Sequence, residues 1–303
     1  MLNAMRFPRR VSLLHGLTFT VALWFILAPL RLRAQGSEVT LTPALVVAGS
    51  PELIRVNAPA SAELEGEWME RKLQFFRSRD GRAWFALAGV DVEAPVGPST
   101  LHISERLPGS PQSDLRRTIE IHPAHYRASS LTVQPKFVSP GPEELKEIEA
   151  EVQLKRKVFA TSADAPEWRG NFREPVPSAP TDSFGTRRMF NGKLASIHTG
   201  MDFRAASGTV VRASNSGTVV LARPLYYEGN CVIIDHGQGL FTLSMHFSRI
   251  DVKEGQRVSQ GDRLGLSGAT GRVTGPHLHW AVRWRGANLD PAKLLKLNLA
   301  VAR

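Results

Sequence analysis

The chain has 303 residues, of which 42% are hydrophobic and 22% charged, a composition typical of globular proteins. Its net charge is +10, but five of these charges are arginines in the first 34 residues, which contain no acid, so +5 belongs to the remainder. This modest basic excess favours contact with an anionic polymer or surface. Because no Lys/Arg-rich run is interleaved with aromatic residues, nucleic acid is not expected as a partner. A single cysteine, Cys231, excludes an intrachain disulfide and a thiolate-rich zinc finger.

The first 34 residues have the layout of a secretory signal peptide. Arg6, Arg9 and Arg10 precede an apolar stretch at 11–30, and small residues follow near Ala34. The apolar stretch has about 20 residues, which is also enough to span a membrane once. We therefore expect an exported protein of the periplasm or cell envelope. Residues 1–34 are either a cleaved signal peptide or a membrane anchor, and membrane contact is expected only through this segment if it stays uncleaved.

Residues 37–125 have the pattern of a small β-sandwich. Short apolar or β-branched runs alternate with turn residues, and the turns are expected near 78–81 and 96–98. The expected strands lie at 39–42, 53–56, 73–76, 84–87 and 118–121. Metal-ligating side chains do not cluster in this part, which is interpreted as a binding or spacer module.

Residues 126–180 are expected to form a linker with an amphipathic helix. Ser139, Pro140 and Pro142 followed by acids are typical of a helix start. Leu145, Ile148 and Val152 then recur at helical spacing and predict one apolar face. A proline-rich stretch at 175–180 leads into the C-terminal domain.

Residues 181–303 are expected to form a compact antiparallel β domain without a long helix. The expected strands lie at 209–211, 218–221, 232–234, 240–243 and 279–282, with glycine-containing turns between them. Cys231 lies in an apolar strand and is interpreted as a small buried hydrophobe. The chain as a whole is therefore predicted to be mostly β, with one connecting helix.

Five of the nine histidines lie in this C-terminal part, and they are His198, His236, His246, His277 and His279. In a strand, His277 and His279 point to the same face while Leu278 points into the core. His198 and Asp202 flank Gly200, which is expected to permit a tight bend. Two histidines and one carboxylate match the three protein ligands of a catalytic zinc ion.

The segment from about 184 to 292 resembles the M23 family of metallopeptidases, the LytM/lysostaphin-type peptidoglycan endopeptidases. The resemblance lies in the runs at 184–188, 198–203, 217–220, 235–237, 244–248 and 271–279, of which 198–203 and 271–279 are the defining motifs. The upstream β region and helix also resemble, less specifically, the N-terminal part of some exported members. Family members usually have Tyr and Leu where this chain has Ser244 and Phe247, and these departures are expected to affect substrate packing.

The resemblance implies specific roles for five side chains. His198, Asp202 and His279 correspond to the Zn2+ ligands, His277 to the catalytic base and His246 to the second catalytic histidine. His236 is not a ligand in the family pattern and is expected to be structural. The implied fold for 181–303 is the LytM-like antiparallel β domain.

The function implied is zinc-dependent hydrolysis of peptide bonds in peptidoglycan cross-links or stem peptides. Peptidoglycan is the expected partner, and a regulatory protein partner is possible but unspecified. The alternative is a non-catalytic LytM-type regulator of other cell-wall hydrolases, although such proteins lack ligands that this chain keeps. Residues 168–180 could also cover the groove in a latent form.

Overall fold

The computed structural model describes residues 38–78, 80–131, 137, 139–190 and 193–300. The predicted signal peptide or anchor at 1–34 lies outside these residues. Within the described part of the chain, no helix is both long and apolar enough to cross a membrane. Gly36–Arg303 form one compact unit, and strands make up most of its regular structure.

The N-terminal part contains two antiparallel sheets of four strands each. One sheet has the order β1 (Val39–Thr42), β2 (Pro51–Val56), β6 (Trp84–Gly89) and β5 (Phe76–Arg77). The other has the order β4 (Arg71–Leu73), β3 (Glu63–Trp68), β7 (Gly97–Arg106) and β8 (Ser113–Ile121). Ile54 and Leu87 of the first sheet share an apolar core with Leu101 and Ile103 of the second. The predicted β-sandwich-like fold is therefore confirmed.

Three details of this part differ from the sequence-based prediction. Residues 73–76 are not one strand, because β4 ends at Leu73 and β5 begins at Phe76. Gly97 and Pro98 begin β7 instead of forming a turn. The start of a strand is a position where proline is tolerated. Strand β3 was not predicted, because its exposed glutamates and Gly66 have low strand propensity.

Helix α1 (Pro142–Ala160) follows the predicted start signal, but its N-cap is Gly141 and not Ser139. The apolar face predicted from Leu145 and Val152 is wrong, since these side chains are 53% and 37% exposed. The helix instead packs through Leu154, Val158 and Phe159. The polar residues Glu151 and Lys155 also lie on this inner side. A pattern of apolar residues alone therefore does not identify this face of the helix.

The C-terminal part is built on a long antiparallel sheet. Its main strand order is β10 (Pro180–Asp182), β13 (Gly200–Phe203), β20 (Leu278–Trp284), β17 (Leu240–Ile250), β16 (Gly229–Asp235), β15 (Gly217–Leu225) and β18 (Arg257–Val258). The additional members are β14 (Val210–Arg212), β19 (Arg263–Ser267) and β21 (Ala287–Leu289), and the short helix α2 (Pro291–Lys296) follows. A separate small sheet joins β12 (Lys193–Ile197), β11 (Arg187–Phe190) and β9 (Ala128–Leu131). The predicted antiparallel β domain is confirmed.

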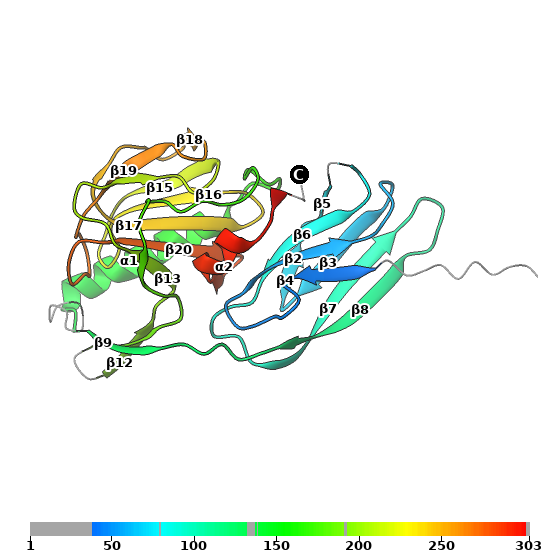
Figure 1. Cartoon of the computed structure of the whole chain (residues 1–303), viewed down its shortest axis with the longest axis horizontal. Helices are drawn as coiled ribbons and strands as arrows, with labels where there is room; N and C mark the ends of the chain where they lie inside the picture. Colours follow the sequence, from blue (N-terminus) through cyan, green and yellow to red (C-terminus); the bar gives the residue numbers. More distant parts are fainter. Residues whose placement is uncertain (1–37, 79, 132–136, 138, 191–192, 301–303) are drawn as a thin grey trace, which may run out of the picture. The chain divides into compact units, whose positions relative to one another are not determined.

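The two faces of the long sheet have different coverings. On one face, Trp280 and Val282 of β20 join the main apolar core. On the other face, Ala281 packs with Phe241 and Leu243, and part of this face is covered by α1 (Figure 1). Because side chains alternate along a strand, His279 lies on the same face as Ala281 and α1. Cys231 is fully buried on this face, as predicted.

Residues 168–176 are held in the main core and do not cover a groove. Trp168, Phe172 and Val176 are all at most 3% exposed and belong to the main apolar cluster. Their large apolar side chains are stabilised by leaving water, which fixes the segment on the core side. The hypothesis that 168–180 blocks the catalytic groove is therefore wrong for this conformation.

Candidate metal centre and catalytic site

The three predicted metal ligands meet at one end of the β13–β20 pair. Asp202 of β13 lies directly opposite His279 of β20 in the strand register. The Asp202 Oδ1 atom is 2.8 Å from His279 Nδ1 and 3.1 Å from His198 Nε2, and the two ring nitrogens are 2.9 Å apart. All three residues are buried, with exposures of 2% for His198 and 7% for the other two. The sheet register thus brings together residues 77 positions apart.

His198 is oriented by the backbone that directly follows β10. Its Nδ1 lies 3.0 Å from the Ser183 carbonyl oxygen, which can only accept a hydrogen bond. The Nδ1 atom therefore carries the proton, and the Nε2 lone pair faces Asp202 and His279. A ligating histidine is commonly fixed in this way by a carbonyl behind it.

The protonation states of His279 and Asp202 suit a metal ion. Burial lowers the pKa of His279 to about 4, so its ring is neutral at neutral pH. Burial alone would raise the pKa of Asp202, but its polar contacts with His198 and His279 outweigh burial and hold the pKa well below its ordinary value. Burial lowers the pKa of His198, whereas hydrogen bonds to Asp182 and Asp202 raise it, and the net direction is upward.

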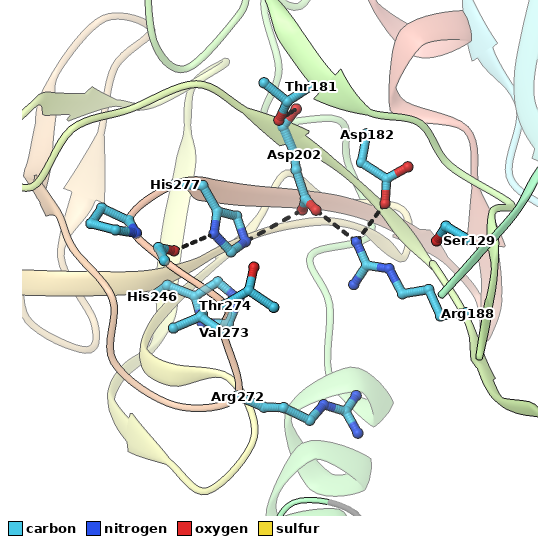
Figure 2. A pocket seen from close by; sticks show the side chains of 12 residues that line it. Ser129, Thr181, Asp182, Arg188, Asp202, His246, Arg272, Val273, Thr274 and His277 are labelled. Carbon is cyan, nitrogen blue, oxygen red and sulfur yellow. Dashed lines mark hydrogen bonds and ion pairs between the residues drawn. The ribbon is translucent and has the colours of Figure 1, made fainter. Parts of the chain in front are cut away.

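A second carboxylate and an arginine lie directly behind the ligands, and the sequence analysis did not identify either of them. Arg188 Nη2 donates to Asp202 Oδ2 at 2.6 Å and to Asp182 Oδ2 at 2.8 Å. Asp182 also lies 3.3 Å from His198 Nδ1. Figure 2 shows His277, Asp202, Arg188 and Asp182 linked in a row across the cavity. Arg188 lies in the run at 184–188 that resembles the M23 family, but nothing in the sequence connects it to Asp202.

His277 and His246 lie beside the ligands, as the resemblance implied. His277 Nε2 is 3.7 Å from Asp202 Oδ1, and its Nδ1 lies 2.8 Å from the Gly275 carbonyl oxygen. The ring centroid of His246 is 4.9 Å from that of His277 and 6.0 Å from that of His279. The structure therefore brings all five predicted side chains into one cluster.

His246 has an unusual backbone and two backbone anchors. Its φ of 65° lies in the left-handed region, which costs a non-glycine residue about 1 kcal/mol. Its amide donates to the Glu228 carbonyl oxygen at 3.0 Å, and its ring Nδ1 lies 2.8 Å from the Thr270 carbonyl oxygen. Burial, reinforced by His279 and His277, lowers the pKa of His246 to about 3, so the ring is neutral.

A cavity of about 360 Å³ opens beside these residues. Its lining includes Asp202, His246 and His277, together with Arg188 and the loop at 272–276 (Figure 2). Ser244 and Phe247, which depart from the family pattern, are 4% and 0% exposed and do not line it. Both side chains belong to the interior, so any effect on substrate packing would be indirect.

Gly200 has a different role from the one expected. It begins strand β13 and its φ is not positive, so no tight bend depends on it. A Cβ atom at this position would lie 2.4 Å from His279 Nε2 and 2.8 Å from the Trp280 carbonyl oxygen. The absence of a side chain provides the space that the His279 ring occupies.

His236 lies apart from the cluster. It is fully buried, with Nδ1 2.7 Å from the Ser216 carbonyl oxygen and Nε2 2.8 Å from Thr242 Oγ1. It is not among the His198–Asp202–His279 group of potential ligands. Its contacts are those of a structural residue.

The donor set fits a metal ion. Two ring nitrogens and a carboxylate oxygen converge within 3.1 Å, and His198 and Asp202 direct lone pairs at the common point. Such a cluster of acceptors is stabilised by a cation between them. Comparison with protein families agrees, since residues 196–291 match the family described as Peptidase family M23. Residues 196–291 are thus similar to the M23 peptidases.

The M23 match extends to characterised bacterial proteins. The chain is 41% identical over 160 residues to the peptidoglycan DD-endopeptidase ShyA of Vibrio cholerae, covering 52% of this chain and 36% of ShyA. It is 41% identical over 98 residues to the DD-carboxypeptidase/endopeptidase Mpg of Neisseria meningitidis, covering 32% of this chain and 23% of Mpg. The matches thus span about a third or less of these relatives' length.

One M23 protein of known structure is similar to this chain over a longer segment than the family model matches. The crystal structure of a Pseudomonas aeruginosa protein described as an M23 peptidase superposes with a TM-score of 0.65 at 27% identity. The superposition covers 82% of this chain and 94% of that chain. The β region upstream of the M23 domain is therefore part of the shared architecture.

Proposed function

We propose that this protein is a zinc-dependent endopeptidase that hydrolyses peptide bonds in peptidoglycan cross-links or stem peptides. The observation that carries the proposal is the convergence of His198, Asp202 and His279, with His277 and His246 beside them on an open cavity. A structural metal site would be closed by a fourth protein ligand, whereas this one has three and a neighbouring space.

Zinc is proposed because two imidazole nitrogens and one carboxylate oxygen form a common ligand set of catalytic zinc. His198 Nε2, His279 Nδ1 and Asp202 Oδ1 would hold the ion. When bound, zinc polarises a peptide carbonyl and lowers the pKa of a water molecule. The ionised Asp202 and the neutral His279 provide the protonation state that binding requires.

His277 is proposed as the general base. Its Nδ1 donates to the Gly275 carbonyl oxygen, so its Nε2 presents a lone pair toward the side of Asp202. A water molecule placed between the ligands and His277 could transfer its proton to this atom. Such proton transfer contributes about 10² to 10⁴ to the rate of an enzyme reaction.

His246 is proposed to stabilise the oxyanion that develops on the attacked carbonyl. The Thr270 carbonyl oxygen fixes the Nδ1 proton, so Nε2 of the neutral ring also presents a lone pair. The ring can donate to an oxyanion only after Nε2 gains a proton. We propose that this proton is the one released by the attacking water, passed on by His277, whose ring centroid lies 4.9 Å from that of His246.

Peptidoglycan is proposed as the substrate on three grounds. ShyA and Mpg are named as peptidoglycan DD-endopeptidase and DD-carboxypeptidase/endopeptidase. The first 34 residues have the pattern of an export signal or anchor, which would bring the domain to the periplasm or cell envelope. The net positive charge favours an anionic polymer.

The second candidate is a non-catalytic regulator of other cell-wall hydrolases. The retained ligand triad and both neighbouring histidines favour the enzyme. A regulator would need neither His277 nor the Asp202 carboxylate in this geometry. Zinc analysis of the purified protein, combined with digestion of purified muropeptides, separates the two functions.

The decisive variants are His279→Ala and His277→Ala. His279→Ala is expected to lose both zinc and hydrolysis, because it removes a ligand. His277→Ala is expected to retain zinc while turnover falls about 10² to 10⁴-fold. A zinc-free His279→Ala protein that digests muropeptides at the wild-type rate would refute the mechanism, and a zinc-loaded wild type without hydrolysis would favour the regulator.

A further inference from the structure

Helix α1 lies on the face of the sheet that carries the metal ligands, although it is outside the M23 match at 196–291. Phe159 stacks edge-on against Phe241 with centroids 5.2 Å apart, and Arg283 of β20 lies over the Phe159 ring. Leu154 and Val158 pack on the same cluster. The helix and the metal centre therefore share one face of the sheet.

Two polar residues of α1 bind the turn between β15 and β16. Both carboxylate oxygens of Glu151 accept from the Tyr226 amide, at 2.8 and 3.0 Å. Lys155 forms an ion pair with Glu228, and the two side chains are 22% and 13% exposed. These contacts attach the turn at 226–228 to the helix at two successive points.

The same turn holds His246. The Glu228 carbonyl oxygen accepts from the His246 amide at 3.0 Å. Beyond Glu228, the Asn230 amide donates to Thr270 Oγ1 at 2.9 Å, and the Thr270 carbonyl oxygen fixes the His246 ring. A Cβ on Gly229 would lie 2.4 Å from the Thr270 backbone, so the turn and the Thr270 loop are in close contact.

We propose that Lys155 and Glu151 are positioning residues that fix His246 through the backbone of Glu228. This inference rests on the proposed function, because it assigns His246 a part in hydrolysis. It places a determinant of turnover in the linker helix, on a part of the chain that the family match does not include.

The physical argument concerns the left-handed backbone at His246. A residue in this conformation keeps it only if its surroundings hold it there. Removing the Lys155 ammonium would leave the Glu228 carboxylate largely buried without its cation, and such a charge moves toward water. The backbone carbonyl of Glu228 accepts from the His246 amide. Movement of Glu228 would therefore release His246 toward an ordinary backbone conformation.

The test compares Lys155→Met, Lys155→Arg and Glu151→Gln with Lys157→Met, an exposed lysine of the same helix. Zinc-loaded full-length proteins are assayed with purified muropeptides well below their melting temperatures. Lys155→Met is expected to lower kcat about tenfold with little change in KM, because a small displacement of a catalytic group affects the transition state most. Lys155→Arg should remain within about twofold of wild type, since it keeps the charge, and Lys157→Met should equal wild type.

A second measurement does not depend on activity. In protein with ¹⁵N-labelled histidine, Lys155→Met should shift the ring resonances of His246 and leave those of the distant His236 unchanged. Unaltered kcat together with unaltered His246 resonances would overturn the inference. An equal loss of kcat in Lys157→Met would also overturn it, because the effect would then belong to the helix in general. An inactive wild type would refute the proposed function instead, and the resonances would still test the positioning.

Discussion

Four histidines of the M23 domain direct Nδ1 at a backbone carbonyl oxygen, and each carbonyl thereby fixes a tautomer. For His198 the acceptor is Ser183, for His246 it is Thr270 and for His277 it is Gly275. Each ring then presents Nε2 without a proton, which is the form that a metal ligand or a general base requires. His236 has the same arrangement, but its Nε2 accepts from a threonine hydroxyl in the interior.

Arg188 is expected to support the metal site through Asp202. Arg188→Gln removes the charged donor to Asp202 Oδ2, so the carboxylate is less firmly oriented and zinc affinity should fall about 10- to 100-fold. Competition with a chelator of known affinity measures this change directly. Arg187→Gln, which alters the exposed neighbour, is the matched control. Equal zinc affinity of Arg188→Gln and wild type would contradict the role.

The sequence indicated the five clustered residues but not the residues that support them. His198, Asp202, His277 and His279 lie in short motifs whose spacing has a chemical meaning. Asp182 and Arg188 are isolated charges whose relation to Asp202 arises only when β10 and β11 take their places. The carbonyl groups that fix the tautomers could not be predicted, because every residue has one and only the tertiary fold selects it.

At the level of elements, apolar and β-branched runs predicted the buried strands β2, β6, β16, β17 and β20, and two of the misses have identifiable causes. Strand β3 is exposed at three glutamates and contains Gly66, so its sequence does not indicate a strand. In α1 the inner side combines Leu154 and Val158 with Glu151 and Lys155, which bind a turn of the neighbouring domain. Apolar periodicity alone cannot identify a helix face whose contacts are partly ionic.

The pairing of β13 with β20 makes a specific demand on Gly200. In Gly200→Ala the new methyl group would meet the His279 ring and the Trp280 backbone, so the ligand or the strand must move. Zinc affinity should fall at least about tenfold, because metal ligands tolerate only small displacements. Isothermal titration of the metal-free protein with zinc measures the effect. Wild-type affinity in Gly200→Ala would show that the ring has room to move.

At the scale of the whole molecule, the N-terminal sheets and the M23 domain share one apolar cluster. Leu289 lies so close to Gly89 that a Cβ there would be 2.6 Å from it, and the Asn288 amide donates to Asp91 at 2.7 Å. The Asp290 amide donates to the Gly49 carbonyl oxygen at 2.8 Å. These contacts join residues of the two parts, and they favour a single unfolding transition.

The buried His236 is expected to make this unfolding sensitive to acid. Burial lowers its pKa from 6.5 to about 4 in the folded protein, so the unfolded state binds more protons between these values. The free energy of unfolding therefore falls as the pH drops from about 6.5 to about 4, by up to about 3 kcal/mol from this residue. Above pH 6.5 the residue should cause no pH dependence.

His236→Gln is expected to reduce the loss between these pH values, because glutamine does not titrate. Urea unfolding at several pH values, with EDTA present so that metal loss does not contribute, measures the free energies. The difference in slope between the two proteins isolates His236, since their other titrating groups are the same. Parallel pH profiles would refute this assignment.

The left-handed conformation of His246 also lowers the stability of the fold. Asparagine and glycine adopt such a conformation more readily than histidine does. A chain selected for stability alone would have one of them at position 246. The imidazole is thus kept where it weakens its own scaffold, and the remaining contacts of the domain must compensate for a reactive group that the fold does not favour.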